Sequence, residues 1–366
     1  MLTKLRYTFI EYTVQKVKAT IYLGNVKRNA QSWKILTGKP LCAVVKANAY
    51  GHGAEEIVCA LSGIADMFAV ALVEEGLAIR QTACGKKILV LTPPLTEEDA
   101  YIMACNRFIA SVTDVEGAKL LSTVCRKYEL PIHVHLKINT GMNRYGLSLS
   151  ELEKVCAFFK EDGGVMVTGV YSHLYDTEYS TALAQRELFL RAVAVCKRYF
   201  PKAVAHLSAT YGCLLGKDFA FDMIRVGLGL YGYLPNSCPN EFRRIGESLG
   251  LQKAMRISAA VVQSGVYTFG GAGYGAPLLT DSTSLSTIRI GYADGCLRKA
   301  DNGLQGCETQ LRPSCMDASI RAATLGRGEW QTVMEDADEV AKRTGTVSYE
   351  VLCAVTRRAE FIYEND

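Results

Sequence analysis

The sequence has no block of like charges and no stripe of basic and aromatic residues. Its 41 Lys and Arg residues are interspersed with 37 Asp and Glu residues, and the formal net charge is +4. Proteins that bind nucleic acid concentrate positive charge on one face or in one segment. We therefore expect no nucleic-acid partner, and the charge of any ligand has to be inferred from the binding site itself.

The features of secreted and membrane proteins are also missing. Residues 1–20 lack the continuous apolar core of a signal peptide, and no apolar run reaches the length of a membrane span. The 13 Cys residues are scattered, odd in number and without a C-x-x-C pair. This pattern favours reduced thiols over a disulfide framework or a zinc site. We expect a cytoplasmic protein with no membrane segment, unless the chain is a domain cut from a longer protein.

The chain is long enough for one large domain and a smaller one, since 49% of its 366 residues are hydrophobic. Short β-rich runs alternate with amphipathic stretches between residues 40 and 230. An earlier amphipathic stretch, GNVKRNAQSWKILTG, is a candidate eighth helix. This alternation predicts an α/β fold with a closed, parallel (β/α)8 barrel, and an open doubly wound sheet is the alternative. The runs cover residues 41–47, 67–72, 86–92, 107–112, 132–138, 165–173, 203–209 and 223–229.

The texture of the sequence changes after Pro235 and Pro239. Residues 255–267 and 284–293 form β-like runs among Gly-rich turns, and the segment DADEVAKRTGTVSYEVLCAV is typical of a helix followed by a strand. We predict a barrel domain over residues 18–240 and a mostly-β C-terminal domain over residues 245–366.

Chemically unusual residues recur where the barrel strands end. One such residue means little, but several at the same rim indicate a site, because barrel enzymes place their chemistry at the C-terminal ends of the strands. They are Lys46 after the first strand, Lys137 and Arg144 around the end of the fifth, His173 ending the sixth, Thr210 after the seventh, and Arg225 with Gly227 on the eighth.

The segment VGLGLYG matches the pattern G-x-G-x-x-G through Gly227, Gly229 and Gly232. A dinucleotide fingerprint requires a helix to open there, whereas two prolines follow, so we reject that interpretation. Glycines after the last barrel strand do suit a phosphate bound by backbone N–H groups. A phosphorylated ligand near a reactive lysine on the opposite strand indicates pyridoxal phosphate.

Histidines leave a second chemistry open. His133 and His135 share one face of a strand, and His173 and His206 end later strands, as in a metal-dependent barrel hydrolase. Such a site would place an acidic residue at the end of the last strand. This chain has Arg225 there, a poor neighbour for a metal ion.

Six segments, in order, resemble the alanine racemase family. They are AVVKANAYGHG, LKINTGMNRYG, IRVGLGLYG, GYADG, CMD and GTVSYEVLC, and the resemblance runs from about residue 19 to residue 355. It implies a barrel with a C-terminal β domain, pyridoxal 5'-phosphate as cofactor, a small amino acid as substrate, and a head-to-tail homodimer whose subunits share the active sites.

The resemblance also implies roles for individual residues. Lys46 would carry the cofactor as a Schiff base and act as one catalytic base, and Tyr274 of the other subunit would be the second. The remaining assignments are Tyr50, Thr210, Gly227, Leu228 and Tyr349 to the phosphate, His173 to the cofactor ring, Arg225 to the pyridine nitrogen, Arg144 and Met316 to the substrate carboxylate, Tyr292 to a place beside Tyr274, and Lys137 to a lysine that is carbamylated in some members.

These roles suit a racemase, because removing a proton from one face of a carbon and returning it to the other requires two bases. Arg225 cannot give up its proton, so the pyridine nitrogen stays an acceptor, whereas related decarboxylases are expected to have an acid there. We expect interconversion of L- and D-alanine, with serine as the competing substrate. A non-catalytic pyridoxal-phosphate carrier is a more remote alternative.

The sequence departs from the family pattern in places. Asn139 stands where the family usually has Asp, and Ala209 and Thr210 stand where it has Asn and Ser. The Thr210 hydroxyl can still contact a phosphate. The segments RGEWQTVM and TRRAEF also differ, which indicates a shortened C-terminal domain.

Overall fold

The computed structural model describes residues 17–176, 178–279, 281–297 and 311–365. The chain divides into two compact units. The barrel unit consists of Thr20–Arg256, Glu335–Ala354 and Ile362–Asp366, and the β unit of Met1–Ala19, Ile257–Met334 and Val355–Phe361. The domain limits expected from the sequence, 18–240 and 245–366, stay predictions.

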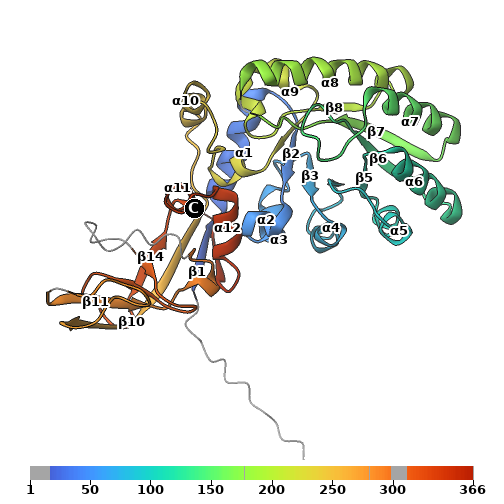
Figure 1. The fold of residues 1–366 in the computed structure, drawn as a ribbon. Coiled ribbons are helices and arrows are strands. Elements are labelled where there is room, and N and C mark those ends of the chain that lie inside the picture. The colour runs from blue at the N-terminus through green and yellow to red at the C-terminus, as the bar shows by residue number, and fades with distance from the viewer. Residues whose placement is uncertain (1–16, 177, 280, 298–310, 366) are drawn as a thin grey trace, which may run out of the picture. The chain divides into compact units, whose positions relative to one another are not determined.

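The barrel unit is built on an eight-stranded parallel sheet in the order β8-β7-β6-β5-β4-β3-β2-β9 (Figure 1). The two ends of this path are bridged by backbone hydrogen bonds from Asp222 to Ala205 and from Arg225 to Ser208, both 2.9 Å. The nearly closed barrel confirms the predicted fold class. Its strands are β2 (Leu41–Val44), β3 (Met67–Val70), β4 (Lys87–Val90), β5 (Ile109–Val112), β6 (Ile132–Lys137), β7 (Val165–Tyr171), β8 (Val204–His206) and β9 (Ile224–Val226).

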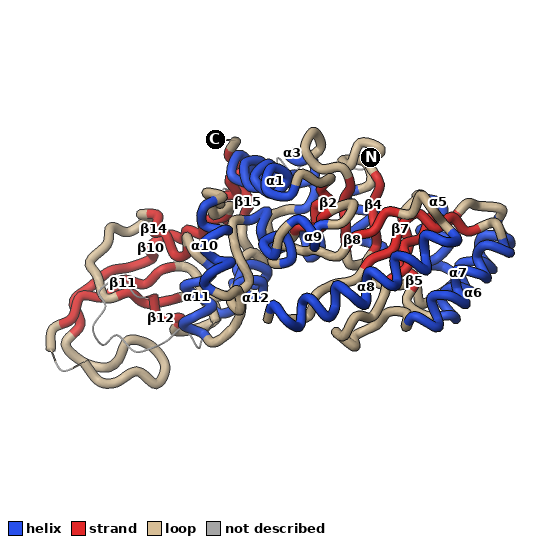
Figure 2. The backbone as a smooth tube through the Cα atoms, turned by 90° about the horizontal axis from the view of Figure 1, so that it is seen from above, coloured by secondary structure: helices blue, strands red, loops and turns tan. Residues whose placement is uncertain are grey.

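The barrel strands are continuous apolar runs because both of their faces are covered. All four residues of β2, β3 and β5 are buried, as expected for parallel strands between a packed interior and outer helices. The helices lie along the outside of the strands (Figure 2). They include α3 (Ala54–Leu61), α4 (Val73–Ile79), α5 (Glu97–Cys105), α6 (Val115–Tyr128), α7 (Leu149–Asp162) and α8 (Tyr179–Tyr199). The chain after β8 also forms the shorter η1 (Gly212–Leu215), α9 (Lys217–Ala220) and η2 (Leu228–Tyr231), and then α10 (Asn240–Ser248).

Helix α1 (Leu23–Thr37) confirms the helix predicted before the first barrel strand. It ends at Gly38, whose φ of 65° is the left-handed conformation that glycine adopts readily. Trp33 is fully buried and donates a 3.0 Å hydrogen bond to the carbonyl of Gly229. Asn29 donates to the carbonyl groups of Leu230 and Gln252. The helix is thereby fixed to the segment that follows β9.

The β unit contains most of a second sheet, in the order β12-β13-β11-β10-β1-β15, with β14 also paired to β10. Pairing of β10 with β11 and β14, and of β13 with β11 and β12, is antiparallel. The unit boundaries fall within β1, β10 and β15. The strands are β1 (Lys18–Tyr22), β10 (Met255–Tyr267), β11 (Thr283–Ile288), β12 (Leu311–Pro313), β13 (Ser319–Arg321), β14 (Trp330–Met334) and β15 (Glu360–Glu364), and η3 (Tyr292–Asp294) is a short helix.

The strand predicted at the end of the segment 336–355 is wrong. Helix α11 (Ala337–Thr344) is followed by a second helix, α12 (Ser348–Val355). Both lie in the barrel unit as far as Ala354. Val351, Leu352 and Val355 are buried, which is the spacing of one helix face rather than the alternation of a strand. No described helix is long and apolar enough to cross a membrane.

Candidate active site

A cavity of about 780 Å³ lies in the barrel unit. Its walls include the residues that follow several barrel strands, so it occupies the C-terminal end of the barrel. Every site residue that the sequence predicted in this unit lines the cavity. These residues are Lys46, Tyr50, Lys137, Arg144, His173, Thr210, Arg225, Gly227, Leu228 and Tyr349.

The chain makes a left-handed turn directly after Lys46. Residues 47–50 have φ values of 51° to 54°, although none of them is glycine, and this conformation costs roughly 1–2 kcal/mol per residue. Local hydrogen bonds offset the cost: Nδ1 of His52 contacts the carbonyl oxygens of Ala49 and Tyr50 at 3.0 and 3.1 Å. Strain of this kind concentrates at functional sites. Here it turns Tyr50 back toward the barrel end.

Gly227, Tyr50 and Thr210 form a cradle after β9. A Cβ atom on Gly227 would lie 2.5 Å from the hydroxyl oxygen of Tyr50, so only glycine leaves room for that hydroxyl. The Thr210 hydroxyl oxygen accepts the N–H of Gly229 at 3.1 Å, which leaves its own proton available to an anion. Hydroxyl groups and backbone N–H groups at a glycine turn are suited to bind a phosphate.

Arg225 is buried and lines the cavity. Its guanidinium donates to the carbonyl oxygens of Ser172 (2.6 Å), His206 (2.9 Å) and Leu207 (3.2 Å), and to Nδ1 of His206 at 2.8 Å. A second histidine, His173, has its Nδ1 3.5 Å from the guanidinium. Arg225 is therefore held by carbonyl and imidazole acceptors.

The contacts of Arg225 fix the protonation of a row of buried histidines. A guanidinium only donates, so Nδ1 of His206 accepts and the proton of that ring is on Nε2. This Nε2 is 2.9 Å from Nδ1 of His135, which must accept in turn. Burial lowers the pKa of His135 to about 3 and, together with the charge of Arg225, holds the pKa of His206 well below its usual range. Both rings are therefore neutral and accept through Nδ1.

The cavity carries a strong excess of positive charge. Lys46, Lys137, Arg144 and Arg225 line it, and Asp176 is the single carboxylate residue among its described lining residues. Burial lowers the pKa of Lys46, and the charge of Arg144 lowers it further. Burial, Arg225 and Arg144 hold the pKa of Lys137 well below its usual range. The site is therefore built for an anionic ligand and contains amines that are readily neutral.

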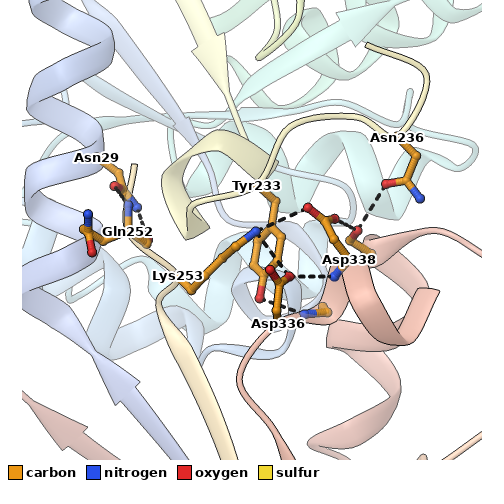
Figure 3. Close-up of polar contacts among 9 residues, drawn as sticks. Asn29, Tyr233, Asn236, Gln252, Lys253, Asp336 and Asp338 are labelled. Carbon is orange, nitrogen blue, oxygen red and sulfur yellow. Dashed lines mark hydrogen bonds and ion pairs between the residues drawn. The ribbon is translucent and has the colours of Figure 1, made fainter. Parts of the chain in front are cut away.

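Tyr349 is held in place through the start of α12. The hydroxyl of Ser348, the preceding residue, donates to Asp338 and to Asn236, the latter at 3.3 Å. Lys253 forms ion pairs with Asp336 and Asp338, each at 3.3 Å. Figure 3 shows Lys253 between these carboxylates and the ring of Tyr233. The Nζ atom of Lys253 lies 3.7 Å from the centre of that ring. We call Lys253, Asp336, Asp338 and Ser348 the helix clamp.

The other three predicted site residues, Tyr274, Tyr292 and Met316, are exposed in the β unit. Hydrogen bonds connect the segments that carry them. The side chain of Arg312 donates to the carbonyl of Tyr274 at 3.4 Å. The N–H of Tyr292 donates to the carbonyl of Cys315 at 3.2 Å, and the N–H of Ala293 donates to the carbonyl of Met316 at 2.9 Å. Their roles in catalysis and substrate binding stay predictions.

The sequence matches the alanine racemase N-terminal domain over residues 21–235 and the alanine racemase C-terminal domain over residues 254–363. The chain belongs to the alanine racemase family. An alanine racemase of Lactobacillus delbrueckii subsp. bulgaricus is 30% identical over 374 residues, which cover 94% of this chain and 97% of the relative. Another, from Synechocystis sp., is 31% identical over 345 residues, 87% of this chain and 90% of the relative.

Solved alanine racemase structures share the fold over nearly the whole chain. The enzyme of D-cycloserine-producing Streptomyces lavendulae has a TM-score of 0.86 at 25% identity and covers 97% of this chain and 98% of its own. The enzyme of Bartonella henselae, described with covalently bound pyridoxal phosphate, has a TM-score of 0.83 at 27% identity, with 96% and 100% covered.

Membership in the alanine racemase family agrees with the arrangement of the histidines. The described residues contain no group of three His, Cys, Asp or Glu side chains placed to hold a metal ion. His206 instead bonds to His135 on one side and to Arg225 on the other. The metal-hydrolase alternative therefore has no support in the geometry.

Sequence reasoning missed two contributors to this site. Tyr171 lines the cavity, stacks on His206 with a centroid distance of 5.0 Å, and donates to or accepts from the Ser111 hydroxyl at 2.7 Å. Glu75 bonds the backbone beside Lys46. A tyrosine within a barrel strand and a glutamate in the first turn of a helix are both ordinary in sequence, so neither gave a signal.

Proposed function

We propose that the protein interconverts L- and D-alanine with pyridoxal 5'-phosphate attached to Lys46. The observation that carries the proposal is the cationic cavity, in which a lysine of lowered pKa stands at one strand end and a buried Arg225 at another. The family assignment supports the reaction, and the bound cofactor of the Bartonella henselae relative supports the cofactor.

The residues of the cavity fit this cofactor. The cradle of Gly227, Tyr50 and Thr210 would hold the phosphate together with Leu228 and Tyr349. Arg225, which its carbonyl partners fix in place, would donate to the ring nitrogen. His173 lies against Arg225 and would brace the ring. Pyridoxal phosphate supplies the electron sink that stabilises negative charge on the substrate α-carbon.

The amine of Lys46 would take and return the α-proton on one face of the substrate. Its lowered pKa leaves a larger neutral fraction near neutral pH, as a general base requires. We propose that Tyr274 of the partner subunit serves the other face, with Tyr292 beside it. Arg144, at the rim of the cavity, and the backbone of Met316 would bind the substrate carboxylate. The active unit is then a homodimer.

Lys137 is proposed to react with carbon dioxide to form a carbamate. Its amine is buried, lies 5.0 Å from the centre of the Tyr171 ring, and has a pKa well below the usual range. A carbamate there would place a negative charge within the fields of Arg225 and Arg144, both of which act on the Lys137 amine. The test is ¹³C NMR after equilibration with labelled bicarbonate. A carbamate signal lost in Lys137→Ala supports the modification, and an unchanged spectrum excludes it.

The central experiment compares kcat/KM for L-alanine and L-serine, in both directions, in protein that shows the cofactor absorbance. A higher kcat/KM for alanine supports the proposal. A clear preference for serine would show that serine is the substrate and would leave the proposed mechanism unaffected. A pocket that merely accommodates a hydroxyl discriminates by about a hundredfold. Lys46→Ala should lose both colour and activity. Retained colour in the wild type with no turnover of any amino acid would indicate a cofactor carrier.

The shared site is tested by mixing inactive chains. Lys46→Ala and Tyr274→Phe homodimers should regain activity after subunit exchange, because each mixed dimer contains one intact site. No recovery after confirmed exchange would contradict the shared site. We also propose a cytoplasmic location, since all the described cysteines are free thiols.

A further inference from the structure

Glu75 bonds to three backbone N–H groups from two different strand ends. Its Oε2 accepts the N–H groups of Ala71 (2.7 Å) and Leu72 (3.2 Å), at the end of β3. Its Oε1 accepts the N–H of Ala47 at 2.7 Å, 28 positions away in the sequence. Ala47 directly follows Lys46 and begins the left-handed turn.

The bond between Ala47 and Glu75 takes the place of the next backbone hydrogen bond between β2 and β3. Backbone pairing between β2 and β3 continues as far as the N–H of Val45, which donates to Ala69 at 2.8 Å. One step further, where the left-handed turn carries the chain away, the carboxylate of Glu75 accepts instead. Lys46 therefore stands between two anchored N–H groups, those of Val45 and Ala47.

We propose that Glu75 is a positioning residue for Lys46: it fixes the backbone from which the lysine reaches the cofactor. The proposal rests on the proposed attachment of the cofactor to Lys46. The carboxylate holds the backbone through Ala47 and does not itself touch the reacting atoms. Its charge also acts on the Lys46 amine, whose pKa it raises against the larger lowering by burial and Arg144.

Helix capping alone does not explain the glutamate, as another helix of the same barrel shows. Asp99 occupies the same position of α5 that Glu75 occupies in α4. Its Oδ2 accepts the N–H groups of Leu95 and Thr96 at 3.0 and 3.1 Å, the same pair of bonds that Oε2 of Glu75 makes. An aspartate therefore suffices for capping, and the additional methylene group of Glu75 carries its second oxygen to Ala47.

This comparison supplies a variant that separates the two roles. Glu75→Asp keeps the charge and the capping bonds but withdraws the oxygen from Ala47, and Glu74→Asp, at the exposed neighbouring position, is the matched control. We expect Tm of the two variants to agree within about 2 °C, because capping is retained. The dissociation constant for pyridoxal phosphate, from spectroscopic titration of cofactor-free protein, should rise about tenfold in Glu75→Asp alone.

Steady-state kinetics with alanine provide the second readout. The kcat of Glu75→Asp should fall about tenfold with little change in KM, because Lys46 is displaced while the substrate-binding groups are not. Equal dissociation constants and kcat values for Glu75→Asp and Glu74→Asp would overturn the inference. So would a Tm of Glu75→Asp as low as that of Glu75→Ala, since capping and positioning would then be inseparable. A wild-type protein that binds no pyridoxal phosphate would instead refute the proposed function.

Discussion

Replacing Arg225 by lysine tests whether the buried guanidinium is fixed by its acceptors. The side chain is only 3% exposed. Its two terminal nitrogens serve separate acceptor pairs, Nδ1 and the carbonyl of His206 on one side and the carbonyls of Ser172 and Leu207 on the other. Lysine keeps the charge but concentrates its donors on one nitrogen, so it can serve one pair and leaves the other unbonded.

The expected loss follows from the acceptors left without a donor. A buried acceptor without a partner costs about 1–3 kcal/mol, so two cost about 2–6 kcal/mol. A typical domain has a total stability of about 5–15 kcal/mol. Arg225→Lys should therefore remove a large part of the stability of the barrel unit before any effect on catalysis is considered.

The two tryptophans allow the barrel unit to be followed by itself. Trp33 is in the barrel unit and Trp330 is in the β unit, so Trp33 alone reports unfolding of the barrel in a Trp330→Phe background. Urea unfolding of cofactor-free protein gives the free energy of unfolding. As control, Arg198→Lys replaces an exposed arginine in a 3.0 Å surface ion pair and should change it by less than about 0.5 kcal/mol. A loss below about 1 kcal/mol for Arg225→Lys would refute the reasoning.

Burial lowers the pKa of His52 from 6.5 to about 4, so the unfolded chain binds the proton first and the free energy of unfolding falls as the pH drops from 6.5 to 4. In urea titrations across this pH range, His52→Asn should reduce the slope of the free energy of unfolding against pH by up to about 1.4 kcal/mol per pH unit. An equal slope in the variant and the wild type would be evidence against a neutral buried ring. Gly227→Ala should weaken pyridoxal phosphate binding at least about tenfold in spectroscopic titrations, because the new methyl group meets the Tyr50 hydroxyl. The control Gly63→Ala has open space at its Cβ and should bind the cofactor with wild-type affinity. Equal affinities of the two variants would contradict the proposal that Gly227, Tyr50 and Thr210 hold the phosphate. Asp338→Ala removes the bonds of this carboxylate to Lys253 and Ser348 in the helix clamp. It should lower the free energy of unfolding of the barrel unit by about 1 kcal/mol and weaken cofactor binding. Unchanged cofactor binding at lowered stability would show that the clamp does not position Tyr349.

The barrel could be predicted because each strand is a short apolar run bounded by helical patterns. The error at α12 has the opposite cause. The run VLCAV is too short for its periodicity to separate helix from strand, and only the tertiary structure shows that Val351, Leu352 and Val355 are buried on one face. Strand β1 is likewise defined by its pairing with β10 and β15, which its five residues do not reveal.

The rim residues of the site could be predicted because a lysine or an arginine at the end of a buried strand is conspicuous. The left-handed turn at residues 47–50 could not, since it lacks the glycines by which such backbone is recognised. Glu75 has the sequence signature of a helix cap, and its bond to Ala47 exists only once two strands lie side by side. Local sequence patterns predict local structure, whereas the partners of Glu75 are brought together by the pairing of β2 with β3, and those of Arg225 by the approach of β9 to β8.

The return of α11 and α12 to the barrel unit has a consequence for synthesis on the ribosome. Tyr349 lines the same cavity as Lys46, yet their codons lie about 300 positions apart. At about 5–20 residues per second, the wall that carries Tyr349 emerges roughly 15–60 s after the lysine. The entire β unit sequence from Ile257 to Met334 is translated in between. A nascent chain therefore has all eight barrel strands but an incomplete cavity until the segment that carries Tyr349 has been translated.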